Sequence, residues 1–150
     1  TLGNATSDAT TVSGTLAVQS TTNSTSKTTG ALTVSGGVGI NNDLHVGGDI
    51  TAFSSSDQTL KENAVGITSA LYKVGLITGY TYSWKSDYHV AGLGIEDTGV
   101  IAQEVEALGL PGITTTREDG IKAVRYERLV PLLIQAIKEL EARVKTLESS

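Results

Sequence analysis

The 150-residue sequence contains no cysteine, no methionine and only two prolines. Without cysteine the chain has no disulfide bond, no thiolate zinc site and no cysteine nucleophile. The absence of methionine predicts that residue 1 lies inside a longer protein. No apolar run approaches the roughly 18 residues of a membrane-spanning helix, and no signal peptide opens the chain. A net charge of −5 without a basic patch argues against nucleic acid as a partner.

Charged and aromatic side chains are scarce in residues 1–55. This segment holds 12 Thr, 8 Ser and 8 Gly, but one basic, three acidic and one aromatic residue. Residues 56–150 hold the other 10 basic residues, 13 of the 16 acidic residues and six of the seven aromatic residues. The first segment has too few large apolar side chains for a monomeric core, whereas the second has enough. We therefore predict two domains, 1–55 and 56–150.

A Leu-x-Val phrase recurs three times in the first segment, at 14–18, 30–34 and 42–46. Its alternation predicts short strands with one apolar face. The leucines are 16 and then 12 residues apart, so the repeat is degenerate. Such short strands need partners from neighbouring repeats or other chains, which favours an intertwined β-stalk. A disordered Ser/Thr linker is the alternative, above all at 21–29.

From residue 56 on, the pattern indicates a small α+β module. The expected helices are 60–63 or 67–74, after the capping-box spacing of Thr59 and Glu62, and 100–108, ended by Gly109 and Pro111. The expected strands are 80–85 and 120–126, and 86–98 is expected to be a loop with turns around Gly92 and Gly94.

The last 25 residues carry an unbroken heptad pattern. Apolar residues spaced 3, 4, 3, 4, 3 fill its a and d positions: Val130, Leu133, Ile137, Leu140, Val144 and Leu147. The pattern predicts a long coiled-coil helix that joins chains. Packing on its own domain is the alternative, although 139–150 lacks the wider apolar stripe that such packing needs. The residue types at a and d nominally favour two strands, so the heptad alone does not specify a trimer.

Ser56 and Lys61 are the strongest candidates for chemistry. A neutral lysine amine can take the proton of a serine hydroxyl, which makes the pair a candidate Ser–Lys dyad. The same spacing also arises by chance among 14 serines and 7 lysines, and the alternative is a helix cap at Ser56 or Thr59 beside a surface lysine. His45 and His89 have no neighbouring ligands at metal-binding spacing, so we predict no metal and no cofactor.

Six blocks of the second segment occur in an order typical of one family: 56–63 (SDQTLKEN), 70–71 (AL), 80–84 (YTYSW), 99–106 (GVIAQEVE), 124–126 (VRY) and 129–140 (LVPLLIQAIKEL). Together they resemble the C-terminal intramolecular chaperone domain of phage tail fibres and tailspikes, the S74 self-cleaving peptidase family. Thr59 departs from the basic residue often found before the Leu-Lys pair. The phrase at 30–37 resembles repeat shafts of phage fibres more weakly.

The resemblance implies a homotrimer in which this domain holds three chains together while the upstream β-shaft, its folding client, interlocks. The domain then cuts itself off. Carried onto this chain, the resemblance makes Ser56 the nucleophile, Lys61 the general base and Ser55–Ser56 the scissile bond, with Asp57 and Asn63 in support. Assembly would take place in the host cytoplasm, with the mature shaft in the virion and the chaperone domain released.

Three other functions compete with this interpretation. The first is a trimerisation module that does not cleave. The second is a receptor-binding fibre tip, which would use exposed aromatic residues: Tyr80, Tyr82, Trp84 and Tyr88. The third is a membrane-anchored transcription factor carrying the same module, against which the Thr- and Gly-rich stalk argues.

Overall fold

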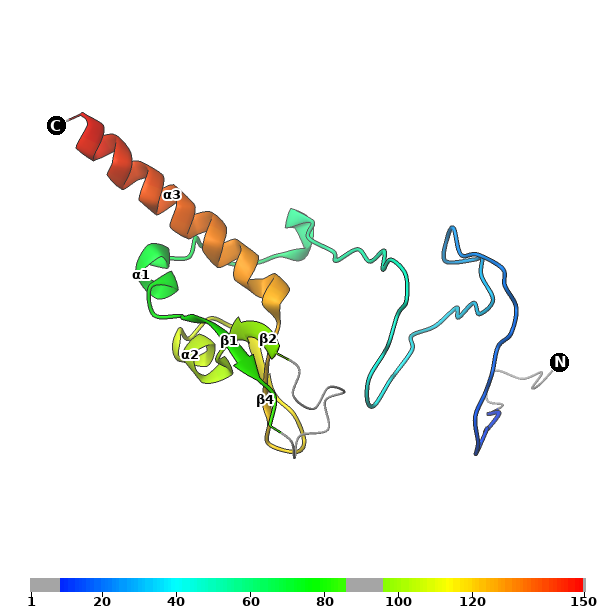
Figure 1. Ribbon diagram of the computed structural model, residues 1–150. Helices are drawn as coiled ribbons and strands as arrows, with labels where there is room; N and C mark the ends of the chain where they lie inside the picture. The colour runs from blue at the N-terminus through cyan, green and yellow to red at the C-terminus, as the bar shows by residue number, and fades with distance from the viewer. Residues whose placement is uncertain (1–8, 86–95, 150) are drawn as a thin grey trace. The chain divides into compact units, whose positions relative to one another are not determined.

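The computed structural model describes residues 9–85 and 96–149 and divides the chain into two units, 1–55 and 56–150 (Figure 1). Within 9–55 the backbone forms no helix or strand, and every residue except Gly30 is exposed. The leucines and valines of the three Leu-x-Val phrases are all at least 45% exposed. A strand needs a neighbouring strand for its backbone hydrogen bonds. The predicted β-stalk therefore remains a prediction for a chain with partners.

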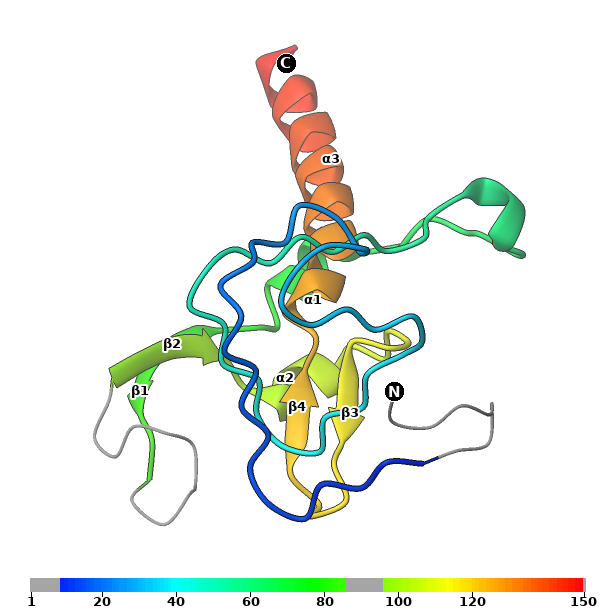
Figure 2. The ribbon, with the colours of Figure 1, turned by 90° about the vertical axis from the view of Figure 1, so that its right-hand side faces the viewer.

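The second unit is a small α+β domain, as the pattern predicts. Its elements are η1 (Gln58–Leu60), α1 (Ala70–Val74), β1 (Gly79–Ser83), β2 (Glu96–Val100), α2 (Ala102–Ala107), β3 (Thr114–Thr116), β4 (Lys122–Val124), η2 (Tyr126–Arg128) and α3 (Leu129–Glu148). β1 pairs with β2 and β3 pairs with β4, both antiparallel (Figure 2). These pairs form separate two-stranded sheets, which are marginal alone, and α2 packs against the β3–β4 pair.

The core of this unit forms where α1 packs against the first half of α3. Ala70 and Leu132 are fully buried, and Ala136 and Leu108 lie beside them at 4% and 8% exposure. The two alanines have no side chain beyond Cβ, so the two helices can approach closely at this point. The second half of α3 extends beyond the rest of the unit (Figure 1).

The Glu139 side chain on α3 caps the beginning of α1. Its two carboxylate oxygens accept hydrogen bonds from the backbone N–H groups of Ala70 and Leu71, each at 2.9 Å. The first N–H groups of a helix have no partner within the helix, and Ser69 makes no side-chain capping bond. The bonds from Leu71 and then Ala70 lower the pKa of Glu139.

A second set of polar contacts ties α2 and η2 to the first sheet. The Glu104 carboxylate accepts from the Thr78 N–H at 3.0 Å and from the Tyr80 hydroxyl at 2.7 Å, which lowers the pKa of Glu104. The Tyr126 hydroxyl accepts from the Val100 N–H at 3.1 Å. A Cβ at Gly99 would overlap that hydroxyl, so any larger residue there would have to displace the Tyr126 side chain.

Two predictions around the loop at 86–98 are wrong. Residues 96–98 belong to β2, and so does Val100, because pairing with β1 places Asp97 opposite Tyr82 and Gly99 opposite Tyr80. The helix expected over 100–108 therefore begins only at Ala102. The predicted turns around Gly92 and Gly94 lie outside the described residues.

The predicted capping box is also wrong. Asp57, not Thr59, caps η1. Asn63 and Ser69 adopt a left-handed backbone conformation, with φ of 51° and 53°, which a right-handed helix does not contain. Neither 60–63 nor the whole of 67–74 is therefore helical, and α1 begins at Ala70. The predicted strand at 120–126 is confirmed in its central part as β4, whose partner β3 was not predicted.

The Glu139 cap predicts a specific acid sensitivity. Because its pKa in the folded chain lies below the ordinary 4.5, the carboxylate stabilises the fold above pH 4.5, and this contribution is lost as the pH falls through the folded value. We expect Glu139→Gln to lower the denaturant midpoint at pH 7. We also expect this variant to lose much less of its denaturant midpoint than the wild type between pH 5 and pH 3.

Glu141→Gln is the matched control, because the Glu141 carboxylate accepts only from Lys145 within the same helix, at 2.6 Å. Chemical denaturation followed by circular dichroism at both pH values measures the effect. Equal midpoints for the two variants at pH 7 would contradict the capping role of Glu139.

Candidate active site

Ser56 and Lys61 lie in contact in the second unit. The Lys61 ammonium donates to Ser56 Oγ at 2.7 Å and to the Ser56 backbone carbonyl oxygen at 2.9 Å. The first distance is short enough for direct proton transfer between the two side chains. Both residues are exposed in the single chain. The five-residue spacing therefore corresponds to a real contact.

A tight 3₁₀ turn brings the two side chains together. The Leu60 N–H donates to the Asp57 carbonyl oxygen at 3.2 Å, and the Lys61 N–H donates to that of Gln58 at 3.0 Å. These two bonds turn the chain back, so the side chain of Lys61 returns to Ser56. The turn is the local structure on which the Ser56–Lys61 contact depends.

Asp57 begins this turn. Its Oδ1 accepts from the Thr59 hydroxyl at 2.6 Å and from the Thr59 backbone N–H at 2.8 Å. These bonds, the hydroxyl bond first, lower the pKa of Asp57. Asp57 therefore supports the turn and forms no ion pair with Lys61 among the described residues. Asn63, the other proposed supporting residue, is exposed and contributes a left-handed backbone conformation that ends the segment.

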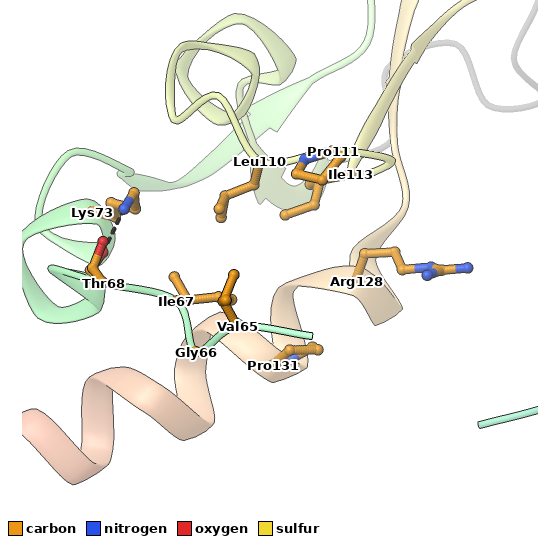
Figure 3. Close-up of a pocket in the computed structure, with 10 residues that line it drawn as sticks. All are labelled: Val65, Gly66, Ile67, Thr68, Lys73, Leu110, Pro111, Ile113, Arg128 and Pro131. Carbon is orange, nitrogen blue, oxygen red and sulfur yellow. Dashed lines mark hydrogen bonds between the residues drawn. The ribbon is translucent and has the colours of Figure 1, made fainter. Parts of the chain in front are cut away.

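A separate apolar groove of about 400 Å³ lies elsewhere in the second unit (Figure 3). Its floor and walls come from three stretches of the chain: 65–68, 110–113 and 128–131, with Lys73 at one side. Neither Ser56 nor Lys61 lines it, so the groove is not a substrate cleft for this pair. The sequence patterns did not predict it, since its lining comes from stretches far apart along the chain.

The six heptad residues of α3 form one exposed stripe, which we call the heptad seam: Val130, Leu133, Ile137, Leu140, Val144 and Leu147. Their exposed fractions run from 44% to 76%. The residues that pack α3 on its own unit, Leu132 and Ala136, occupy heptad positions c and g instead. The helix therefore uses one face for its own unit and leaves the other uncovered.

The aromatic residues considered for a fibre tip take structural contacts. The rings of Tyr82 and Trp84 meet edge to face with centroids 5.3 Å apart, and both donate to Asp97 Oδ2, at 3.4 and 3.2 Å. Tyr80 donates to Glu104. Tyr88 lies outside the described residues. These contacts give Tyr80, Tyr82 and Trp84 a role in joining β1 to its neighbours.

The described residues contain no group of side chains that could hold a metal ion around His45. His45 is exposed in the first unit, and His89 lies outside the described residues. Within 9–85 and 96–149, no three side chains of the metal-binding types gather around one point. The same ranges contain no helix with the length and hydropathy needed to cross a membrane.

Comparison with known proteins assigns the class of the second unit. Residues 56–114 match the Peptidase_S74 family model, described as chaperone of endosialidase. The match begins at Ser56, the first residue of the second unit. The second unit is therefore similar, over residues 56–114, to the chaperone domain that this family model describes.

Its relatives are phage fibre proteins. The chain is 37% identical over 117 residues to the long tail fiber protein Gp37 of Enterobacteria phage K3 and, equally, to that of Enterobacteria phage T2. Each alignment covers 73% of this chain but only 9% and 8% of the relatives. The chain thus spans a small part of their length, and it is similar to virion components.

Proposed function

We propose that this chain is the C-terminal region of a phage tail fibre whose second unit trimerises, guides folding of the upstream β-shaft and then cuts the Ser55–Ser56 bond. The observation that carries the proposal is the 2.7 Å contact between Lys61 Nζ and Ser56 Oγ at the start of the family match. The boundary between the two units supports the position of the cut, because cleavage there would separate them cleanly.

The proposed chemistry uses these two side chains, water and a hydrogen-bond donor to the developing oxyanion. Neutral Lys61 accepts the Ser56 hydroxyl proton while Oγ attacks the Ser55 carbonyl carbon. The carbon–nitrogen bond then breaks, Lys61 returns the proton to the Ser56 amine, and Ser55 is left as an ester on Ser56 Oγ. Water hydrolyses the ester and yields the Ser55 carboxylate and a free Ser56 hydroxyl.

Intramolecular delivery explains why the pair needs no substrate pocket. The attacked carbonyl belongs to the residue directly before the nucleophile, so the ring that closes has five members. Effective molarities for well-oriented reactions of this kind reach roughly 10⁵ M and above, which replaces the free energy of substrate binding. An exposed pair that lines no groove in the described residues is consistent with a cut made once per chain.

Substitution of either residue is expected to stop cleavage. Ser56→Ala removes the nucleophile, and Lys61→Ala should slow cutting by about 10²-fold or more, the usual contribution of a general base. Ser54→Ala, which changes a neighbouring hydroxyl only, is the matched control and should cut normally. Gel electrophoresis and intact mass spectrometry follow the products. Fragments split before residue 56 in the Ser56→Ala chain would exclude Ser56 as the nucleophile.

The exposed heptad seam supports association of chains through α3, without by itself specifying their number. An apolar stripe along a 20-residue helix gains free energy when it is removed from water, and the seam residues are 44% to 76% exposed in the single chain. The exposed leucines and valines of the first unit need partners for the same reason. Three chains joined through α3 would raise the local concentration of the three upstream segments.

The order of these events explains why the module would be removed at the end. Contacts between chains in a β-shaft form late, since the entropy of bringing distant segments together is lost before the contacts stabilise them. A module that trimerises first accelerates this step, in the host cytoplasm. Cleavage then releases the module and leaves a kinetically stable shaft in the virion.

Cutting is expected to require assembly of the chains. Aspartates at Ile137 and Leu140 place unpaired charges in the seam and should yield a compact monomer that stays uncut with Ser56 and Lys61 intact. Aspartates at Lys138 and Lys145, on the outer face of α3, are the control and should leave a trimer that cuts. Light scattering gives the oligomeric state, and circular dichroism checks that the monomer is folded. Efficient cutting by a folded monomer would refute the coupling.

A further inference from the structure

We propose that the Thr59 hydroxyl is a positioning group that holds the Asp57 carboxylate on its own turn and so keeps Lys61 directed at Ser56. The proposal rests on the proposed self-cleavage and concerns its pH dependence. Thr59 itself makes no contact with Ser56 or Lys61 in the described structure. It acts through Asp57.

Both hydrogen bonds to the Asp57 carboxylate come from Thr59. Both the hydroxyl and the N–H of Thr59 donate to the same carboxylate oxygen, at 2.6 and 2.8 Å. A bond from a hydroxyl to a carboxylate at 2.6 Å is of the short, charge-assisted kind, which is about twice as strong as a neutral one. The backbone bond alone would leave the carboxylate freer to rotate about its side-chain torsions. The hydroxyl therefore fixes where the negative charge lies.

Lys61 has two nearby carboxylates along the chain, Asp57 and Glu62. Among the described residues, Lys61 forms no ion pair within 4.0 Å with either of them or with a carboxylate of another segment. Its ammonium donates instead to two oxygens of Ser56. Asp57 is the residue between the nucleophile and the turn, so a released Asp57 carboxylate is the natural competitor of Ser56 for this ammonium.

Such competition would impair a general base in two ways. A carboxylate paired with a lysine stabilises the ammonium form, so the amine becomes neutral only at higher pH. The pair would also draw the amine away from the hydroxyl whose proton it must accept. An aspartate with an ordinary pKa is ionised from pH 6 to pH 10, so a released Asp57 carboxylate would carry its charge over the whole range of the test. The Thr59 hydroxyl thus keeps a permanent anion away from the dyad.

The test is the pH profile of cleavage by the full chain. A labelled chain made by a short pulse of cell-free synthesis is diluted into buffers from pH 6 to pH 10, and the cut fraction is followed on gels. For Thr59→Val we expect the midpoint of the profile to rise by about one pH unit, the lower end of the effect of a nearby opposite charge. The rate at neutral pH then falls by about tenfold and recovers at high pH.

Three further chains separate positioning from mere stability. Thr59→Ser keeps the hydroxyl and should restore the wild-type midpoint. The double variant Asp57→Asn with Thr59→Val should also return the midpoint, because an amide cannot form the competing ion pair. Thr115→Val, an exposed β-branched site on β3, controls for loss of a threonine hydroxyl elsewhere.

The outcomes of this experiment are distinct. A Thr59→Val profile that coincides with the wild type, or that falls equally at every pH, overturns the positioning role while cleavage itself stands. A double variant that keeps the raised midpoint overturns it as well. A wild-type chain that remains uncut at every pH, or a Ser56→Ala chain that is cut, overturns the proposed self-cleavage and the positioning role with it.

Discussion

The second unit depends on one carboxylate that bridges its two ends. Glu139 binds the first N–H groups of α1, 68 and 69 residues earlier in the chain, and so fixes α1 against α3. With α1 in place, Leu132 and Ala136 face inward. That orientation turns the other side of α3, the heptad seam, toward solvent. The same contact that completes the fold of one chain therefore determines which face is left for other chains.

Long periodic elements were predictable, and elements set by distant partners were not. The spacing from Val130 to Leu147 predicts α3 because one helix face repeats over five intervals. The beginning of α1 could not be predicted, since its cap is a side chain at Glu139 rather than a residue next to it. β3 escaped prediction because three threonines carry no apolar alternation and pair only when β4 lies beside them.

In the candidate site, too, some features could be predicted from the sequence and others could not. Ser56 and Lys61 could be chosen from the order of family blocks around them, but their spacing alone was ambiguous. Ser56, Asp57 and Thr59 are all residue types that favour a helix N-cap, so the sequence did not say which one begins the turn. Asp57 does so because Thr59 supplies two donors to one oxygen, a geometry that no periodicity encodes.

Exposure connects the site to assembly. A lysine acts as a base near neutral pH when burial disfavours its charged form, yet Ser56 and Lys61 lie in a fully exposed turn of the single chain. The seam on α3 is also exposed, at 44% to 76%. If association of chains covers both the apolar seam and the Ser56–Lys61 pair, it removes the two from water at the same time. A cut timed in this way needs no separate trigger, because the free energy of assembly itself supplies the active base.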